Sequence, residues 1–344
     1  MLCSRLPRIS LAEFPTLLEE APRLSAAMGG VHLFIKRDDV CGLCSGGNKV
    51  RVMEYAMGEV LERGCDTVIA SAAAQSNKLR EIAAAASRLG LRAVLLLQDD
   101  PPAATTEQGN LLLFHLLGAD VRYLGSDCSG AGVVEAQRQL QEQLEREGHK
   151  VAVMDRRLPY GAAATAGYVT AAEELVLQLR AQTVDPDFIY VTAGAGMTMA
   201  GLVLGLKHLG CRARVVGVSA ESKADKLCES VVDFAQRAAQ LIGLSTVVEA
   251  EDFDVVDDQV KTGYGVVTAP IVDTIRLVAR QHGMVLDPVY NGKTMLSLRD
   301  HVHSGRVTSD HTVVFINTGG TPALFAHNAE LMAPGAAAIN EHSP

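Results

Sequence analysis

Tryptophan is absent from the sequence, and only 4% of its 344 residues are aromatic. The formal net charge is -9, and lysine and arginine form no long run. Binding to nucleic acids and anionic membranes depends on basic patches, and single-stranded nucleic acids also stack on aromatic side chains. We therefore expect neither a nucleic acid nor a membrane among the partners of this chain.

No apolar run reaches the roughly 20 residues that a membrane-spanning helix needs. The N-terminal segment is broken by Arg5, Pro7 and Arg8, and it lacks the continuous apolar stretch of a signal peptide. We therefore expect a cytoplasmic protein. Because 48% of the residues are hydrophobic and 21% are charged, we also expect a globular fold with a large core.

The seven cysteines are odd in number and scattered, which disfavours a disulfide framework. Cys41 and Cys44 form a single CxxC pair, whereas a structural zinc site needs four ligands. We expect reduced thiols and no metal, with a redox or metal-binding pair as the alternative. The sequence also contains no HExxH and no GxSxG motif, which disfavours a zinc protease and an α/β hydrolase.

Short apolar runs alternate with amphipathic segments along the chain. Residues 92–97 and 312–317 are predicted strands, and residues 77–89, 197–208 and 322–332 are predicted helices. This alternation is typical of a doubly wound α/β fold, in which helices cover both faces of a parallel sheet. Ligands of such folds bind at the carboxyl ends of the strands, so the turns that follow strands are the places to search for a site.

Two glycine-rich segments carry candidate chemistry. In residues 45–51 (SGGNKVR), Lys49 stands at a predicted helix start after paired glycines, where a lysine can form an imine with a carbonyl cofactor. A surface lysine that opens a helix is the alternative. Residues 192–198 (TAGAGMT) join a strand to a helix and predict an anion site at the helix N-terminus. A dinucleotide site, with Glu221 as a ribose ligand, and a plain tight turn remain the alternatives, although the full GxGxxG spacing is missing.

Three further segments contain polar groups near predicted strand ends or turns. Ser76 and Asn77 follow one strand and supply hydroxyl, amide and helix-start N–H groups that suit a carboxylate, although an ordinary N-cap is the commoner explanation. Tyr264 lies between two glycines and Tyr290 follows a proline turn, where a tyrosine can act as an acid or a base. Residues 317–321 (NTGGT) end the last strand.

These segments, in this order, resemble the fold type II (tryptophan synthase β-like) pyridoxal-phosphate enzymes, in particular the 1-aminocyclopropane-1-carboxylate deaminase and D-cysteine desulfhydrase family. The resemblance covers residues 9 to 325, and its most specific part is FIKRDD at residues 34–39 followed by GGNK at 46–49. It implies two doubly wound, three-layer domains: a large one (1–45 and 160–344) and a small inserted one (46–159). It also implies pyridoxal 5'-phosphate as cofactor, a small amino-acid substrate and a homodimer.

The resemblance also implies roles for individual residues. Lys49 corresponds to the lysine that forms the Schiff base, and Thr318 lies in the segment that reaches the pyridine nitrogen. The expected catalytic residues are Lys49, Ser76, Tyr264 and Tyr290. The expected cofactor-binding residues are Asn48, Lys49, Ala193, Gly194, Ala195, Gly196, Met197, Thr198, Asn291 and Thr318. The expected substrate-binding residues are Gln75, Ser76, Asn77, Lys78 and Tyr264.

Two positions depart from the family pattern. Lys78 stands where His or Gln is common, and its ammonium either binds a second acidic group on the substrate or points to solvent. Asn291 stands where the deaminases carry Glu and the desulfhydrases carry Thr, and it cannot supply a negative charge to the pyridine nitrogen. A neutral partner of that nitrogen favours limited charge delocalisation, and hence elimination or β-replacement over transamination.

The function that the sequence favours is that of a pyridoxal-phosphate-dependent lyase or deaminase acting on a small amino acid by α,β-elimination. A β-replacement synthase or a racemase-like biosynthetic enzyme is the alternative within this class. A nicotinamide-dependent oxidoreductase would use the segment around Gly194 for a pyrophosphate but would not need Lys49. A protein that binds pyridoxal phosphate as a sensor is the third class.

Overall fold

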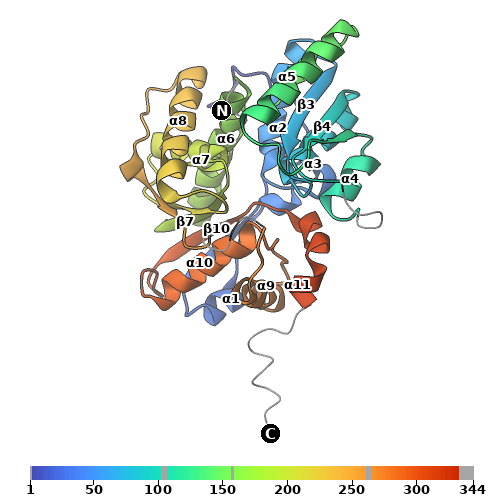
Figure 1. The fold of residues 1–344 in the computed structure, drawn as a ribbon. Coiled ribbons are helices and arrows are strands. Elements are labelled where there is room, and N and C mark those ends of the chain that lie inside the picture. The colour runs from blue at the N-terminus through green and yellow to red at the C-terminus, as the bar shows by residue number, and fades with distance from the viewer. Residues whose placement is uncertain (1, 102–106, 156–158, 261–262, 264, 333–344) are drawn as a thin grey trace.

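The computed structural model describes residues 2–101, 107–155, 159–260, 263 and 265–332, and its strands form two separate sheets (Figure 1). The larger sheet has six strands in the order β1-β2-β10-β7-β8-β9, all parallel except β1, which pairs antiparallel with β2. These strands are β1 (Leu18–Glu20), β2 (His32–Arg37), β10 (Thr312–Asn317), β7 (Phe188–Ala193), β8 (Arg214–Ser219) and β9 (Phe253–Val256).

The smaller sheet has four parallel strands in the order β5-β4-β3-β6. Its sequence is rich in Val, Ile, Leu and Ala without alternation, because both faces of this parallel sheet are covered. These strands are β3 (Thr67–Ala72), β4 (Arg92–Leu97), β5 (Asp120–Tyr123) and β6 (Val151–Val153).

Helices cover both faces of the six-stranded sheet, as the alternation of strand side chains requires. Tyr190 and Phe315 belong to one hydrophobic core, whereas Val191 and Ile316 point to the opposite face and belong to another. The first core packs against α1 (Pro22–Ala27), α9 (Ala269–His282) and α10 (Asn291–His303), and the second against α6 (Pro159–Gln182), α7 (Met197–His208) and α8 (Ala224–Ile242).

The four-stranded sheet is also the middle of three layers. Ile69 and Leu96 pack against α5 (Ala131–Arg146) on one face, while Val68 and Leu95 face the opposite core. That opposite core includes residues of α2 (Lys49–Glu62), α3 (Asn77–Leu89) and α4 (Asn110–Leu116). Helix α2 also packs along α6, and in this way joins the two sheets through one continuous core.

The predicted strands 92–97 and 312–317 and the predicted helices 77–89 and 197–208 have the bounds that the sequence indicated. The predicted helix 322–332 is wrong. Its residues form a 3-10 helix (Thr321–Ala326) and the short helix α11 (Asn328–Met332), because His327 between them has a non-helical φ of -118°. Further 3-10 helices among the described residues are Asp38–Val40, Leu43–Ser45 and Ala250–Asp252.

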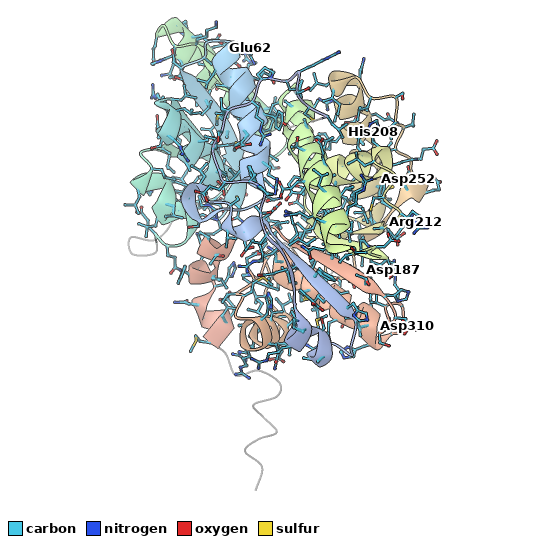
Figure 2. All side chains as sticks on the ribbon, turned by 180° about the vertical axis from the view of Figure 1, so that it is seen from behind. Glu62, Asp187, His208, Arg212, Asp252 and Asp310 are labelled. Carbon is cyan, nitrogen blue, oxygen red and sulfur yellow. The ribbon has the colours of Figure 1, made fainter. Side chains whose placement is uncertain are left out.

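Charged, exposed residues mark the amino ends of the large sheet. Asp187, Arg212 and Asp310 precede β7, β8 and β10, and they lie at the outer side of the molecule in Figure 2. The carboxyl ends of these strands lie on the opposite side, which is where ligands bind in folds of this type. Within the described residues, no helix has the length and apolar character to cross a bilayer, and no cluster of three or more His, Cys, Asp or Glu side chains is placed to hold a metal ion.

Candidate active site

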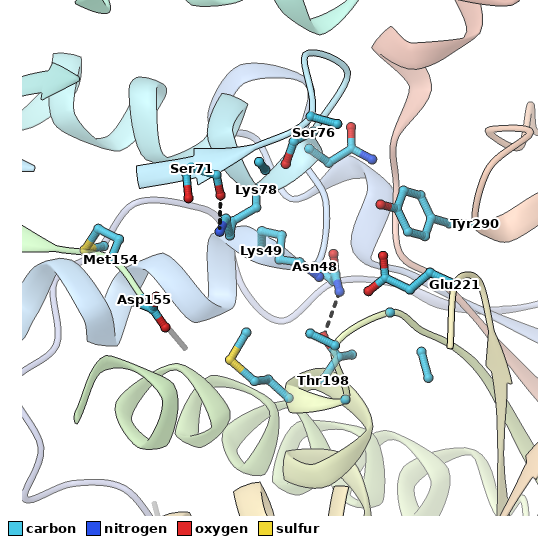
Figure 3. Close-up of a pocket in the computed structure, with 18 of the residues that line it drawn as sticks. Asn48, Lys49, Ser71, Ser76, Lys78, Met154, Asp155, Thr198, Glu221 and Tyr290 are labelled. Carbon is cyan, nitrogen blue, oxygen red and sulfur yellow. Dashed lines mark hydrogen bonds between the residues drawn. The ribbon is translucent and has the colours of Figure 1, made fainter. Parts of the chain in front are cut away.

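A cavity of about 570 Å³ lies where the carboxyl ends of strands from both sheets meet (Figure 3). Its wall combines the end of β3 and the start of α3, the start of α2, and the turn from β7 into α7. Glu221 after β8, Tyr290 before α10 and Thr318 after β10 complete the wall from the large sheet. Segments that are far apart in the sequence thus contribute polar groups to one space.

Lys49 is the first residue of α2, and its side chain points into this cavity (Figure 3). The two preceding glycines have positive φ angles, 64° at Gly46 and 124° at Gly47. A Cβ at Gly46 would overlap the backbone oxygen of Asp39, and one at Gly47 would lie 3.2 Å from the backbone oxygen of Thr318. Glycine is therefore required at both positions for the chain to bring Lys49 to this place.

The surroundings of Lys49 favour a neutral amine. Burial and the nearby ammonium of Lys78 lower the pKa of Lys49 from 10.5 to about 8, although the carboxyls of Glu81 and Glu221 act in the opposite direction. A lysine with a lowered pKa is a nucleophile near neutral pH. The alternative of a solvated surface lysine therefore does not describe Lys49.

Residues 193–198, which we call the anion cradle, connect the end of β7 to the N-terminus of α7 and line the cavity. Gly196 caps the helix with a φ of 101°, and a Cβ placed on Gly194 would have Glu221 Oε1 and Tyr290 Cε1 as its nearest neighbours, at 3.8 and 3.9 Å. The free N–H groups of the first turn and the helix dipole favour a phosphate here. Asn48 fixes the last residue of the cradle, because its Nδ2 donates to Thr198 Oγ1 at 2.9 Å.

Ser76 and Asn77 present hydrogen-bond donors at the N-terminus of α3. Ser76 caps the helix and accepts a bond from the nitrogen of Leu79 at 3.4 Å. Asn77 Oδ1 accepts bonds from Arg80 Nη1 and Asn110 Nδ2, both at 2.9 Å, so its amide nitrogen is turned away from these two donors. A donor amide, a hydroxyl and the free N–H groups of the first turn suit a carboxylate.

Arg80 and Asn110 are residues that the sequence did not indicate. Both are fully buried, and Arg80 Nη1 also donates to Asn110 Oδ1 at 3.1 Å. They orient Asn77 without lining the cavity themselves. The available signal was an arginine three residues after Asn77, at the start of an alanine-rich segment.

Gln75 and Lys78, on either side of this pair, point in different directions. The Gln75 amide donates to the oxygen of Gln108 at 3.0 Å and accepts from the nitrogen of Asn110 at 2.9 Å, so it supports the start of α4 rather than the cavity wall. Lys78 lines the cavity, and its Nζ donates to the oxygen of Ser71 at 3.1 Å. Lys78 therefore lies in the cavity wall and does not point to bulk solvent.

The last two segments meet on the opposite side of the cavity. Tyr290 and Thr318 line the wall, whereas Asn291 is fully buried beneath Thr318 and bonded to Asp287 and Gly319. The structure thus places Thr318, and not Asn291, in a position to touch a cofactor. Tyr264 lies outside the described residues.

The donor set of this cavity fits pyridoxal phosphate. Lys49 supplies an amine for the aldehyde, residues 193–198 supply N–H groups for the phosphate, and Thr318 supplies a hydroxyl on the same wall. The donors of Ser76 and Asn77 in the same cavity can bind a second anion, such as the carboxylate of an amino acid.

Comparison with known proteins agrees with this fit. The family model described as "Pyridoxal-phosphate dependent enzyme" matches residues 9–319. A putative 1-aminocyclopropane-1-carboxylate deaminase of Pyrococcus abyssi is 34% identical over 334 residues, which cover 96% of this chain and 97% of the relative. A D-cysteine desulfhydrase of Salmonella typhi is 36% identical over 332 residues, which cover 94% of this chain and 97% of that protein.

Solved structures show the same relationship. The crystal structure of an ACC deaminase homologue superimposes with a TM-score of 0.86 at 33% identity, over 96% of this chain and 97% of that one. The diaminopropionate ammonia lyase of Escherichia coli, at 18% identity and a TM-score of 0.67 over 98% of this chain and 91% of that one, shares the fold.

The predicted α/β fold of type II, the cofactor and the resemblance to the deaminase and desulfhydrase family are therefore confirmed. The nicotinamide-dependent alternative is wrong, since residues 9–319 match a family of pyridoxal-phosphate dependent enzymes. The chain belongs to the family of pyridoxal-phosphate dependent enzymes.

Proposed function

We propose that the protein is a lyase or deaminase that acts on a small amino acid by α,β-elimination. The observation that carries this proposal is the position of Lys49, an amine whose pKa is lowered to about 8, between the anion cradle at residues 193–198 and the proposed carboxylate site at Ser76 and Asn77. When bound, pyridoxal phosphate supplies an electron sink for negative charge at the substrate α-carbon. The names of the relatives, a deaminase and a desulfhydrase, support the same reaction class.

In this proposal Lys49 has two tasks, and the other residues have one each. Lys49 Nζ holds the cofactor and, with its pKa lowered to about 8 by burial and by Lys78, accepts the proton of the substrate α-carbon. Ser76 and Asn77 hold the substrate carboxylate and orient that carbon. Tyr290 lines the same cavity and is the second acid or base, with Tyr264 as the other candidate.

The direction of Lys78 favours a substrate with a second acidic group. Lys78 and the Ser71 oxygen that it binds lie on the same cavity wall, beside the proposed carboxylate site. An ammonium there attracts a sulfonate or carboxylate on the substrate side chain, as in a sulfonated alanine.

A β-replacement synthase or a racemase-like enzyme is the second candidate, because the same residues can protonate or deprotonate the α-carbon without releasing ammonia. We also propose a homodimer and the division into a large domain (1–45 and 160–344) and a small one (46–159), which corresponds to the two sheets. A cytoplasmic location is proposed because all seven cysteines are free thiols, as a reducing compartment maintains them.

The test is product analysis on the purified holoenzyme. The wild type and Lys49→Ala are incubated separately with D-cysteine, 1-aminocyclopropane-1-carboxylate and both enantiomers of cysteate, each with and without sulfide as a nucleophile. The 2-keto acid, the ammonia and the amino acids in each mixture are measured. Stoichiometric keto acid and ammonia from the wild type alone support the lyase. A new intact amino acid, or racemised substrate without ammonia, supports the second candidate and contradicts the first.

A further inference from the structure

Asn291 lies in a buried hydrogen-bond network whose donors and acceptors follow from the backbone alone. Its Nδ2 is 2.6 Å from the carbonyl oxygen of Gly319, and its Oδ1 is 3.0 Å from the backbone nitrogen of Thr318. A carbonyl oxygen can only accept a hydrogen bond, and a backbone N–H can only donate one. The reversed amide would bring two oxygens together and two N–H groups together, so the orientation of Asn291 is fixed.

Asp287 anchors this amide from the other side. Its carboxylate is fully buried and accepts bonds from the backbone nitrogens of Val289, Tyr290 and Asn291 at 3.0, 2.8 and 2.8 Å. It also accepts the second N–H of the Asn291 amide at 2.8 Å. Both hydrogens of the Asn291 side chain are therefore committed, to Asp287 and to Gly319, and only its oxygen faces Thr318.

The polarity of the Thr318 hydroxyl follows from this arrangement. Thr318 Oγ1 lies 3.1 Å from Asn291 Oδ1, an atom that can only accept. The contact is a hydrogen bond only when the hydroxyl gives its single hydrogen to Asn291. Thr318 also lines the cavity. While its hydroxyl keeps the bond to Asn291, a ligand atom that meets this hydroxyl must be a donor.

We propose that Asp287 and Asn291 hold the Thr318 hydroxyl as a hydrogen-bond acceptor toward the cavity, and that the ring nitrogen of the bound cofactor is consequently kept protonated. In this proposal Lys49 holds the aldehyde of the cofactor and residues 193–198 hold its phosphate. The phenolic oxygen is next to the aldehyde on the ring. The ring nitrogen, across the ring, is the polar atom left for Thr318. A pyridine nitrogen can donate a hydrogen bond only in its protonated form.

This inference changes one expectation from the sequence. From the sequence, a neutral partner of the ring nitrogen, such as Thr318 or Asn291, was expected to limit charge delocalisation. Because the hydroxyl of Thr318 donates its hydrogen to Asn291, it favours a ring nitrogen that carries a proton. A cofactor with a protonated ring nitrogen is the stronger electron sink. The inference depends on cofactor binding in this cavity and not on the identity of the amino-acid substrate.

The test is the ¹⁵N chemical shift of ring-labelled pyridoxal phosphate in the substrate-free holoenzyme. We expect the shift of a protonated pyridine across neutral and mildly alkaline pH in the wild type and in Thr318→Ser, which keeps the hydroxyl. Thr318→Val keeps the shape but removes the acceptor, and its ring nitrogen should lose the proton within that range. An unprotonated ring in the wild type, or identical shifts in wild type and Thr318→Val, would overturn the proposal.

A second measurement covers the case in which Thr318→Val does not retain the cofactor. The dissociation constants of pyridoxal phosphate and its 1-deaza analogue, in which C–H replaces the ring nitrogen, are compared on the wild-type apoprotein. We expect weaker binding of the analogue, because it has no N–H donor for Thr318, and equal affinities would contradict the proposal. Neither readout requires turnover, so a failure of the proposed lyase activity remains distinguishable from a failure of this inference.

Discussion

Arg51 and Asp38 form a fully buried ion pair one helical half-turn beyond Lys49, with Arg51 Nη2 2.8 Å from Asp38 Oδ1. Arg51 also binds Glu174 of α6, and the hydroxyl of Tyr168, on the same helix, donates to Asp38 at 2.5 Å. This network connects the end of β2, the first turn of α2 and the middle of α6. It therefore fixes the turn of helix that carries Lys49.

Arg51→Met should lower the free energy of unfolding by about 3–5 kcal/mol, because it leaves the buried carboxylate of Asp38 and the partly buried one of Glu174 without their guanidinium partner. Arg63→Met, on the same helix but at an exposed arginine, is the matched control and should change stability by less than about 1 kcal/mol. Urea unfolding of both apoproteins measures the difference. Equal effects of the two substitutions would contradict a stabilising role for the buried pair.

The same pair predicts a loss of stability in acid. Although burial acts to raise it, the Arg51 guanidinium holds the pKa of Asp38 below its ordinary value. The unfolded chain therefore binds more protons than the native state once the pH falls below about 4, so the stability from this pair is present near neutral pH and is lost in acid. Urea midpoints measured down the acid range should fall more steeply for the wild type than for Arg51→Met.

The reactivity of Lys49 should titrate near neutral pH. Burial and then Lys78 lower its pKa to about 8, so the rate of cofactor attachment should rise with pH through that value as the neutral amine appears. Lys78→Met removes one of the two causes, so the midpoint should move upward toward the ordinary lysine value of 10.5, while Lys78→Arg keeps the charge and should keep the midpoint. The rate is followed by trapping with borohydride, and an unchanged midpoint in Lys78→Met would show that burial alone is responsible.

Asn77→Ala should weaken substrate binding by removing a donor to the substrate carboxylate. A hydrogen bond to a charged group contributes about 1.5–3 kcal/mol, which corresponds to a rise in KM of about 10-fold to 100-fold. Asn328→Ala, at an exposed asparagine of α11, is the control and should leave KM unchanged. Steady-state kinetics on the substrate found by product analysis provide the measurement, and a fall in kcat at constant KM would contradict the carboxylate role.

The sequence could predict which segments form the site because strands in a parallel sheet end at the same edge. Lys49, Ser76, Gly194 and Thr318 follow or flank such ends, and the cavity contains all four. The sequence could not predict the supporting residues, because their partners come from other segments. Asn110 meets Asn77 across 33 residues.

The local sequence pattern also could not predict the direction in which a side chain points. Gln75 and Asn291 are neighbours of cavity residues in sequence, yet Gln75 turns to the start of α4 and Asn291 to Asp287 and Gly319. In both cases the deciding bond is to a backbone group that packing brings into reach. A sequence pattern locates such a residue to within one position, whereas tertiary contacts decide which way it faces.

Gly196→Ala should weaken cofactor binding. Gly196 has a φ of 101° at the N-terminus of α7, and its Cβ would lie 3.4 Å from side-chain carbons of Leu227 and Val231. An alanine strained by about 1–2 kcal/mol there would relax by moving the anion cradle, and restoring the cradle on binding would raise the dissociation constant about 5-fold to 30-fold.

The matched control is Gly210→Ala, just beyond the other end of the same helix. Gly210 also has a positive φ, 71°, and nothing within 4 Å of a Cβ. Both substitutions should therefore lower stability by about 1 kcal/mol through backbone strain, which thermal unfolding of the apoproteins measures. Only Gly196→Ala should change the dissociation constant in a fluorescence titration with pyridoxal phosphate. Equal affinities in the two variants would mean that the phosphate is held elsewhere than at the start of α7.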